Sequence, residues 1–469
     1  MIPIIYKSRI MIKIEINKYM YKLYLLMANT DNIYKLVDEI HLKNKASGNR
    51  FVFTTTGGGF SSYSYLMARP GASNTVLQLN GPYAQEATIK YIENPIESFA
   101  SLEASNELAI TSLKQCREIM TNSKKSIYDL SCLKNCYGVG VSAALATNRW
   151  LKGEHRIYIV VTSDTARFMF SVNLYKGYPP CPETSEKMFR SRTEEEDLCG
   201  KLIIFIIAYI CKVVTKEFFF ESLYKDNFLN EEDTFTFRED VFNNPIERLL
   251  KSVYPQFSTR EETVNSVLCV PNQNGTFTFL INSSPKNVVI LPGSFNPLHQ
   301  GHISSLNNSC ASNNSEGLFE LCIINVDKPS LTSTEIERRL DQFKFPNTIP
   351  IVLTNSPLFV DKAKLFPGNS YAIGIDLVIR LINPKYTNGD EDRMIENIFG
   401  MISKGTKFYV SSRTYGKAHI PDDFIMKMKD NDLISLKDVM PYIPSILKKY
   451  FIENLFNEYK DLSSSELRV

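Results

Sequence analysis

The sequence predicts an α/β protein of two or three domains, and three observations lead to this fold class. The 469 residues exceed the length of one ordinary domain. In the N-terminal half, segments with apolar side chains at helical spacing alternate with short apolar runs typical of strands. From residue 288 onward, short apolar runs recur with helical segments between them, which is the pattern of a doubly wound parallel sheet. Such a sheet binds its ligands at the carboxyl ends of its strands.

Helices and strands alternate through the first domain, which we assign to residues 27–215. Ile33, Leu36, Val37 and Ile40 recur at intervals of three or four, which predicts an amphipathic helix over 30–45. The other elements expected in this domain are helices at 101–121 and 196–213 and strands at 51–53, 157–161 and 167–172.

Residues 216–285 are expected to connect the domains and to carry a small β-structure of their own. Asn272-Gln273-Asn274-Gly275 predicts a hairpin turn between strands at 267–270 and 276–280. The second domain then covers 286–469, where a Rossmann-like doubly wound parallel sheet is expected. Its strands are expected at 288–291, 321–326, 349–353, 371–375 and 407–411.

Composition limits the partners of the chain. The apolar fraction of 43% and the charged fraction of 22% are those of a globular protein, and a net charge of +2 gives no pull toward nucleic acid or an anionic membrane. The most apolar run, residues 202–211, is far shorter than the about 20 residues of a membrane span. Nine cysteines, an odd count in a chain without a clear secretory signal, indicate a reducing compartment. We expect a cytoplasmic protein that binds neither nucleic acid nor membranes, and a homo-oligomer stays open.

Residues 1–26 are expected to be a leader or upstream extension outside the fold. They are rich in Ile, Tyr, Met and Lys, contain one acid, Glu15, and lack a small-residue cleavage site. Met27 is an alternative start, and organellar targeting by residues 1–26 is the competing interpretation.

The most informative stretch is residues 288–302, V-V-I-L-P-G-S-F-N-P-L-H-Q-G-H. Its apolar run predicts a buried strand, and its Pro and Gly residues then form a tight turn. If a helix starts near Leu298, His299 and His302 lie on one face of its first turn. Free N–H groups at a helix N-terminus favour a phosphate, and two imidazoles add donors aimed at the same anion. Chance placement of the five histidines of this chain would produce only roughly 0.05 pairs at this spacing.

This stretch resembles the signature of the HxGH nucleotidyltransferase superfamily, with His299-Gln300-Gly301-His302 as its motif. The nicotinamide- and nicotinate-mononucleotide adenylyltransferases have a similar sequence before this motif, which here reads Gly293-Ser294-Phe295-Asn296-Pro297. Their second phosphate motif resembles Ser463-Ser464-Ser465-Glu466-Leu467-Arg468. The resemblance implies that His299 and His302 are catalytic. The nucleotide- and phosphate-binding residues that it implies are Gly293, Ser294, Phe295, Asn296, Lys328, Gly374, Asp376, Arg380, Ser464, Ser465 and Arg468.

In that family a phosphate oxygen of the acceptor attacks the α-phosphorus of a nucleoside triphosphate. Because the acceptor is already an anion, catalysis consists of placement and of stabilisation of negative charge. The resemblance implies ATP, Mg²⁺ bound with it, and a phosphorylated acceptor, with nicotinamide or nicotinic acid mononucleotide in first place. No metal site made of protein side chains is expected, because Mg²⁺ bridging phosphates needs few of them. Cytidylyl transfer and phosphopantetheine adenylylation are alternatives, and a non-catalytic nucleotide-binding regulatory protein is another.

A second motif, Thr56-Gly57-Gly58, is followed by a helical pattern and by Pro70-Gly71-Ala72-Ser73. It resembles the CinA C-terminal family, which hydrolyses the amide of nicotinamide mononucleotide, over about residues 35–213. Two positions differ. The family's serine is Thr54 here, and its lysine aligns near Thr88, with Lys90 as an approximate substitute. A hydroxyl nucleophile needs a base or a nearby cation, so hydrolysis is not expected. Thr54, Thr56, Gly57 and Gly58 form the candidate ligand loop, and a scaffold role is the alternative.

Overall fold

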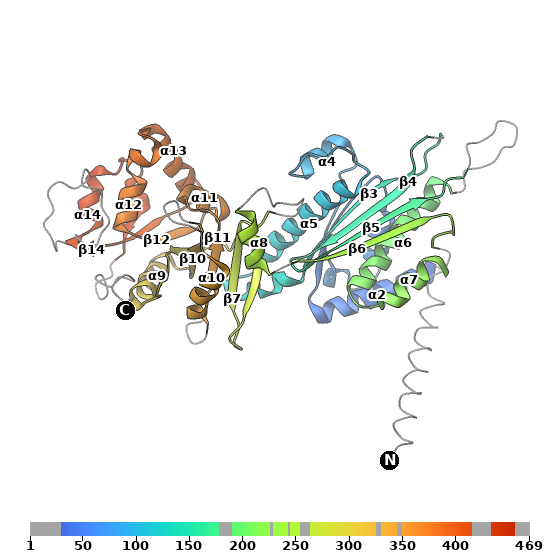
Figure 1. The fold of residues 1–469 in the computed structure, drawn as a ribbon, viewed down its shortest axis with the longest axis horizontal. Coiled ribbons are helices and arrows are strands. Elements are labelled where there is room, and N and C mark those ends of the chain that lie inside the picture. The colour runs from blue at the N-terminus through green and yellow to red at the C-terminus, as the bar shows by residue number, and fades with distance from the viewer. Residues whose placement is uncertain are drawn as a thin grey trace, which may run out of the picture. The chain divides into compact units, whose positions relative to one another are not determined.

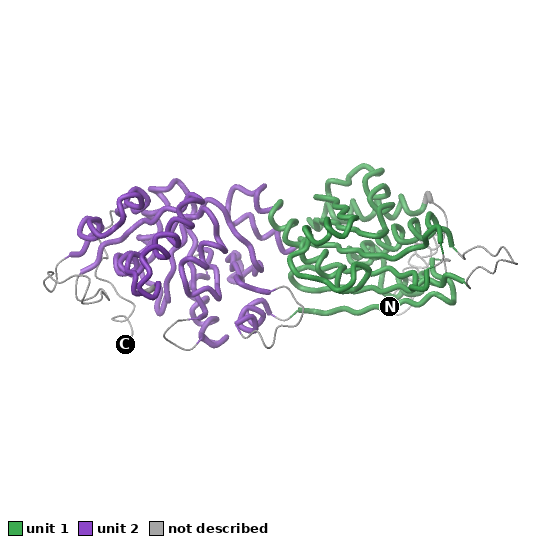
Figure 2. Tube along the Cα trace, turned by 90° about the horizontal axis from the view of Figure 1, so that it is seen from above, with its two compact units in different colours: residues 1–119, 135–242 green, residues 120–134, 243–469 purple. Residues whose placement is uncertain are grey.

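The computed structural model describes residues 30–149, 151–177, 190–225, 228–242, 244–253, 263–324, 330–344, 349–414 and 433–454. The chain forms two compact units (Figure 1; Figure 2), unit 1 with residues 1–119 and 135–242 and unit 2 with residues 120–134 and 243–469. Each unit is a mixed α/β structure, as the sequence predicts. Residues 1–26 and four predicted site residues, Lys328, Ser464, Ser465 and Arg468, lie outside the described residues.

Unit 1 contains a six-stranded sheet in the order β2-β1-β3-β4-β5-β6. Its strands are β1 (Arg50–Thr56), β2 (Val76–Asn80), β3 (Cys136–Ala144), β4 (His155–Thr162), β5 (Ala166–Leu174) and β6 (Thr234–Val241). β1 pairs in parallel with β2 and β3, and β4, β5 and β6 continue the sheet in antiparallel order. The strands predicted at 51–53, 157–161 and 167–172 are confirmed within β1, β4 and β5.

The helices of unit 1 are α2 (Thr30–Ser47), α3 (Ser61–Met67), α4 (Gln85–Tyr91), α5 (Leu102–Asn122), α6 (Arg192–Ile210) and α7 (Lys216–Lys225). They confirm the predicted helices at 30–45, 101–121 and 196–213. The backbone of α5 lies directly on β3, since a Cβ at Gly138 or Gly140 would come within 2.1 Å of the carbonyl oxygens of Ala109 or Ser105. The sequence does not predict β3, because glycine is depleted in strands. In β3 the glycines lack a Cβ and so allow the backbone of α5 to pack closely against the strand.

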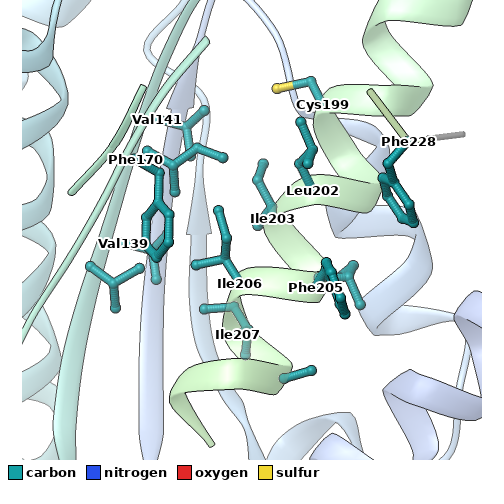
Figure 3. Close-up of a cluster of buried hydrophobic side chains, with 14 of the residues drawn as sticks. Val139, Val141, Phe170, Cys199, Leu202, Ile203, Phe205, Ile206, Ile207 and Phe228 are labelled. Atoms are coloured by element: carbon teal, nitrogen blue, oxygen red, sulfur yellow. The ribbon is translucent and has the colours of Figure 1, made fainter. Parts of the chain in front are cut away.

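The C-terminal half of α6, residues 202–210, is apolar on every side and almost entirely buried. Ile203 and Ile206 point toward the sheet residues Val139 and Phe170 (Figure 3), and all four side chains are inaccessible to solvent or nearly so. On another side of the helix, Phe205 stacks on Phe228 with ring centroids 5.6 Å apart. A helix that is hydrophobic all round belongs to a core. Within the described ranges, no helix combines the length and the apolarity that crossing a bilayer requires.

Unit 2 contains an eight-stranded sheet in the order β16-β13-β12-β9-β10-β11-β7-β8. Its strands are β7 (Ser266–Pro271), β8 (Phe277–Ile281), β9 (Val288–Pro292), β10 (Glu316–Cys322), β11 (Ile351–Thr354), β12 (Ser370–Gly374), β13 (Phe408–Ser411) and β16 (Phe451–Glu453). The six strands from β16 to β11 are parallel, and β7 and β8 form an antiparallel edge. Numbered along the chain, the parallel strands lie in the order 3-2-1-4-5-6 of a Rossmann-like fold, with the switch point between β9 and β12.

The segment expected as a connector contributes to both sheets. β6 joins the sheet of unit 1, and β7 and β8 join that of unit 2. The predicted strand at 321–326 also differs, because β10 begins at Glu316, where pairing with Val288 of β9 starts. Glu316 is fixed there by Ser126 Oγ and the Ile127 N–H, each of which donates to its carboxylate at 2.6 Å.

The helices of unit 2 are α8 (Pro245–Ser252), α9 (Gln300–Asn313), α10 (Ser333–Leu340), α11 (Phe359–Leu365), α12 (Ile375–Leu381), α13 (Glu391–Ile402) and α14 (Leu436–Val439), with the 3₁₀ helix η4 (Asp341–Phe343) after α10 and a small antiparallel pair, β14 (Arg413–Thr414) and β15 (Leu433–Ile434). Leu306 of α9 and Ile336 of α10 share a core with Val289 and Phe319 of the sheet. Phe359 of α11 contacts Tyr371 of β12. The sheet places the end of β9 beside its switch point.

Candidate functional site

The turn between β9 and α9 is anchored by Gly293 and Phe295. The Gly293 N–H donates to the Glu320 carbonyl at 3.0 Å, and a Cβ at Gly293 would lie 2.6 Å from the Phe295 ring. That ring is fully buried and packs edge-on against Phe319 and Phe343, with centroids 5.1 and 5.4 Å apart. Phe295 adopts a φ of 47°, which returns the chain toward α9. The Phe295 side chain therefore serves the core of unit 2 and fixes the turn.

His299 and His302 lie at the start of α9. His299 is the N-cap residue, and His302 belongs to the first turn. Their rings stack with centroids 3.7 Å apart and planes inclined by 25°. The His299 backbone N–H donates to His302 Nδ1 at 3.4 Å, which leaves the proton of a neutral His302 on Nε2. His299 Nδ1 is buried and has no hydrogen-bond partner among the described residues.

Both imidazoles are neutral near pH 7. Burial, with smaller contributions from His299 and the Arg413 guanidinium, lowers the pKa of His302 to about 3. Burial and Arg413 also lower the pKa of His299. A guanidinium close to two neutral imidazoles, at the N-terminus of a helix of fourteen residues, favours an anion.

Two charged residues from the neighbouring strands reach the same edge of the sheet. Asp376 lies in the first turn of α12, directly after β12, and Arg413 follows β13. β9, β12 and β13 are adjacent and parallel, so their carboxyl ends lie together. Arg413 Nη1 is 3.3 Å from Asp376 Oδ2. Arg413 is absent from the sequence prediction, because a basic residue after a strand is indistinguishable by pattern from a solvated loop residue.

The other two predicted residues of this segment flank Asp376. Gly374 is exposed and forms the N-cap of α12, and Arg380 is exposed in the last turn of that helix. Because α12 leads away from the end of β12, Arg380 lies farther from the strand ends than Asp376 does.

Helix α10 and η4 hold the turn that precedes the histidines. Arg339 Nη1 donates to the Ser294 carbonyl at 2.8 Å, and Arg338 Nη2 donates to Asn296 Oδ1 at 2.5 Å. Gln342 Nε2 donates to the Phe295 carbonyl at 2.9 Å, and Gln342 Oε1 accepts from the Leu298 N–H at 2.7 Å.

Glu335 orients the two arginines of α10. It accepts from Arg338 Nε and from Arg339 Nε, both at 2.8 Å. The hydrogen bonds from Arg338, with those from Arg339, lower the pKa of Glu335 to about 2, so it is ionised at any physiological pH. The sequence pattern does not predict these contacts of α10 with the turn.

In unit 1, Thr54 is fully buried in β1. Its hydroxyl lies 2.7 Å from both Ser112 Oγ and Tyr91 OH, and it accepts from Asn80 Nδ2 at 3.2 Å. Lys90, the approximate substitute for the family's lysine, is exposed on α4. The Thr54 hydroxyl is therefore part of a closed hydrogen-bond network.

The glycine-rich loop after β1 is packed against its surroundings. Thr56 pairs with Ser142 at the end of β1, and a Cβ at Gly57, whose φ is 76°, would lie 2.0 Å from the Ala143 carbonyl. Gly58 is buried, with Leu145 2.6 Å from the position of a Cβ.

A carboxylate occupies the amides at the end of this loop. The Gly59 N–H donates to Glu196 Oε2 at 2.9 Å, and the Ser61 N–H donates to Glu196 Oε1 at 3.1 Å. Backbone amides that such a loop would offer to a phosphate are thus used by an internal anion.

Within the part of the chain that the structure describes, no group of three or more His, Cys, Asp or Glu side chains is placed to hold a metal ion.

No protein-family model matches the chain, and no curated protein matches it. Among solved structures, the chain is similar to a competence-damaged protein (CinA) superfamily protein from Escherichia coli, with 12% identity, a TM-score of 0.27, and coverage of 40% of this chain and 93% of that one. It is similar to a competence or damage-inducible protein from Enterobacter asburiae, with 10% identity, a TM-score of 0.27, and coverage of 39% and 98%. It is also similar to competence damage-inducible protein A from Klebsiella pneumoniae, with 11% identity, a TM-score of 0.27, and coverage of 38% and 95%. At these values the function of each unit rests on its own residues.

Proposed function

We propose that unit 2 is a nucleotidyltransferase that joins the nucleoside monophosphate of ATP to a phosphate-bearing acceptor. One observation carries the proposal: two neutral, stacked imidazoles lie at the N-terminus of α9, directly after the first parallel strand and beside the switch point of the sheet. Ligands of open α/β sheets bind at that point, and helix N-termini bind phosphate.

The reaction needs no protein nucleophile. A phosphate oxygen of the acceptor forms a bond to the α-phosphorus, and the bond from that phosphorus to the bridging oxygen breaks, so that its electron pair leaves with pyrophosphate. Negative charge on the phosphates increases during this transfer, and donors fixed in advance stabilise it. His302 Nε2–H and the first N–H groups of α9 would supply such donors, with His299 beside them. Mg²⁺ bound with ATP would supply positive charge to the phosphates.

The acceptor that we propose is nicotinamide or nicotinic acid mononucleotide. The sequence of the turn, Gly293 to Pro297, supports the mononucleotide adenylyltransferases over the other branches of that superfamily. Arg339 and Gln342 donate to backbone carbonyls of the turn, and Arg338 donates to the Asn296 side chain. These contacts support a turn that is preorganised without a ligand.

A pyrophosphate-release assay on the full-length protein tests the proposal. ATP and CTP are each paired with nicotinamide mononucleotide, nicotinic acid mononucleotide and phosphopantetheine, and a His299→Ala/His302→Ala double variant is the control. We expect release with ATP and a pyridine mononucleotide and none from the double variant. Release only with CTP, or only with phosphopantetheine, would change the substrate. Tight ATP binding without release from any pair would favour the regulatory alternative.

A further inference from the structure

Arg413 is held at the edge of the sheet by the same network that holds α9. Just before it, Ser411 Oγ lies 2.9 Å from Ser305 Oγ of α9. Asn454 Nδ2, at the end of β16, donates to the Ser305 carbonyl at 3.0 Å and to Ser411 Oγ at 3.2 Å. Asn454 Nδ2 also donates to Ser309 Oγ of α9 at 3.0 Å, and both residues are almost completely buried. The strand end that carries Arg413 and the helix that carries the histidines are therefore fixed to each other.

One contact joins Arg413 and Asp376. At 3.3 Å it is longer than the 2.7–2.9 Å typical of charge-assisted hydrogen bonds, and the Arg413 side chain is 30% exposed. The second carboxylate oxygen, Asp376 Oδ1, is buried and accepts no hydrogen bond from any described residue. The contact with Asp376 uses one of the two terminal nitrogens of the guanidinium.

Arg413 also acts electrostatically on both histidines at the start of α9. Of the charged groups that the structure describes, Arg413 is the one that lowers the pKa of both His299 and His302. A guanidinium presents five N–H donors in a planar fork that matches phosphate oxygens, and one of them is directed to Asp376.

We propose that Arg413 is a phosphate-binding residue of the unit 2 site, and that Asp376 is a positioning residue that orients its guanidinium through Oδ2. The ligand is the polyphosphate of a nucleotide. This assignment rests on the proposed function for its biological substrate, but it concerns binding and can be tested without turnover.

Calorimetric titration of the full-length protein with inorganic tripolyphosphate tests the assignment. Loss of a charge-assisted contact is expected to make Arg413→Gln bind about ten- to a hundredfold more weakly. Arg413→Lys keeps the positive charge but loses the planar set of guanidinium donors. Its affinity for tripolyphosphate should therefore lie between those of the wild type and Arg413→Gln. Arg393→Gln, which removes an exposed arginine from α13 of the same unit, is the matched control and should stay within about twofold of the wild type.

Two further measurements separate binding from structure. NMR titration should show a higher pKa for His299 in Arg413→Gln and an unchanged one in Arg393→Gln, because only the former removes the nearby charge. In a double-mutant cycle, Asp376→Asn should change tripolyphosphate affinity in the wild-type protein and have little effect in Arg413→Gln. Equal effects of Asp376→Asn in the two backgrounds would overturn its positioning role.

The assignment of Arg413 fails if the wild type does not bind tripolyphosphate, or if Arg413→Gln and Arg413→Lys both bind it as the wild type does. If Arg413→Gln fails to fold, Arg413→Lys decides the question. Arg413-dependent binding without pyrophosphate release would contradict the proposed reaction and leave the binding site in place. Pyrophosphate release that is unaffected by Arg413→Gln would contradict the assignment of Arg413 and leave the proposed reaction in place.

Discussion

The imidazole of His299 stacks on that of His302, with ring centroids 3.7 Å apart, at the point where β9 gives way to α9. Because the two rings are so close, protonation of one disfavours protonation of the other, and burial disfavours both. The pair therefore presents N–H donors that carry no charge near pH 7.

Replacement of either histidine should slow the transfer. His299→Ala or His302→Ala is expected to reduce kcat by about 10²–10³, as the loss of one preorganised donor does. Steady-state pyrophosphate release, with circular dichroism as the check on folding, measures this. Asn307→Ala, an exposed change on the same helix, is the matched control. Wild-type turnover in both histidine variants would contradict the role of the pair.

The stability of unit 2 should depend on pH through His302. The unfolded chain takes up a proton near pH 6.5, whereas folded His302 does so only near pH 3. The unfolded state therefore binds more protons between these values, and the contribution of His302 to the free energy of unfolding is lost at about 1 kcal/mol per unit as pH falls from 6.5 toward 3. Urea unfolding at several pH values should show a shallower pH dependence for His302→Gln than for the wild type. Parallel curves would contradict the lowered pKa.

The contacts between η4 and the turn that precedes α9 should affect the rate of the proposed transfer. Gln342→Glu keeps the acceptor for the Leu298 N–H but cannot donate to the Phe295 carbonyl. Misplacement of the turn is expected to reduce kcat by about ten- to a hundredfold. The measurement is pyrophosphate release at saturating substrate. Gln273→Glu, in an exposed hairpin turn of the same unit, should leave kcat unchanged, and an equal loss in both variants would point to net charge instead.

Unit 1 should not release ammonia from nicotinamide mononucleotide. The Thr54 hydroxyl is fully buried and bonded to Ser112 and Tyr91, so it cannot attack a ligand. Thr54→Ala should instead lower the free energy of unfolding by about 1–3 kcal/mol, because it leaves buried polar partners unsatisfied. Thr54→Ser should restore most of that loss. Ammonia release by the full-length protein that disappears in Thr54→Ala would show that unit 1 is a hydrolase.

The terminal serine motif lies outside the described residues, and its role stays a prediction. Arg468 is the basic residue within 463–469, so deletion of residues 468–469 should weaken ATP binding by about ten- to a hundredfold if that segment grips the phosphates. Calorimetry with ATP measures this, and the melting temperature should change little. If the deletion protein binds ATP as the wild type does and Arg413→Gln binds it more weakly, Arg413 is the residue that binds the phosphates.

The sequence by itself predicted the helices and strands that are specified by the spacing of residues close together in the chain. Ile33, Leu36, Val37 and Ile40 predict α2 because a helix repeats every 3.6 residues, and all four are buried. The meeting of His299 and His302 is likewise local, since it needs only a helix start at the expected place. Local patterns do not predict β3. Glycine is required at Gly138 and Gly140 because the backbone of α5, which is distant in the chain, packs directly against them.

Only the tertiary structure decided the contacts between residues far apart in the chain. Arg413 meets Asp376, Gln342 meets Phe295, and Glu196 meets the amides of Gly59 and Ser61. Each contact depends on which strand ends the sheet order brings together and on how its helices pack, and no spacing in the sequence encodes that order. The sequence by itself therefore determined the α/β class and the histidine pair. The strand order and side-chain packing decided which charges surround that pair and that the Thr54 hydroxyl is buried, because both follow from long-range burial and hydrogen bonding.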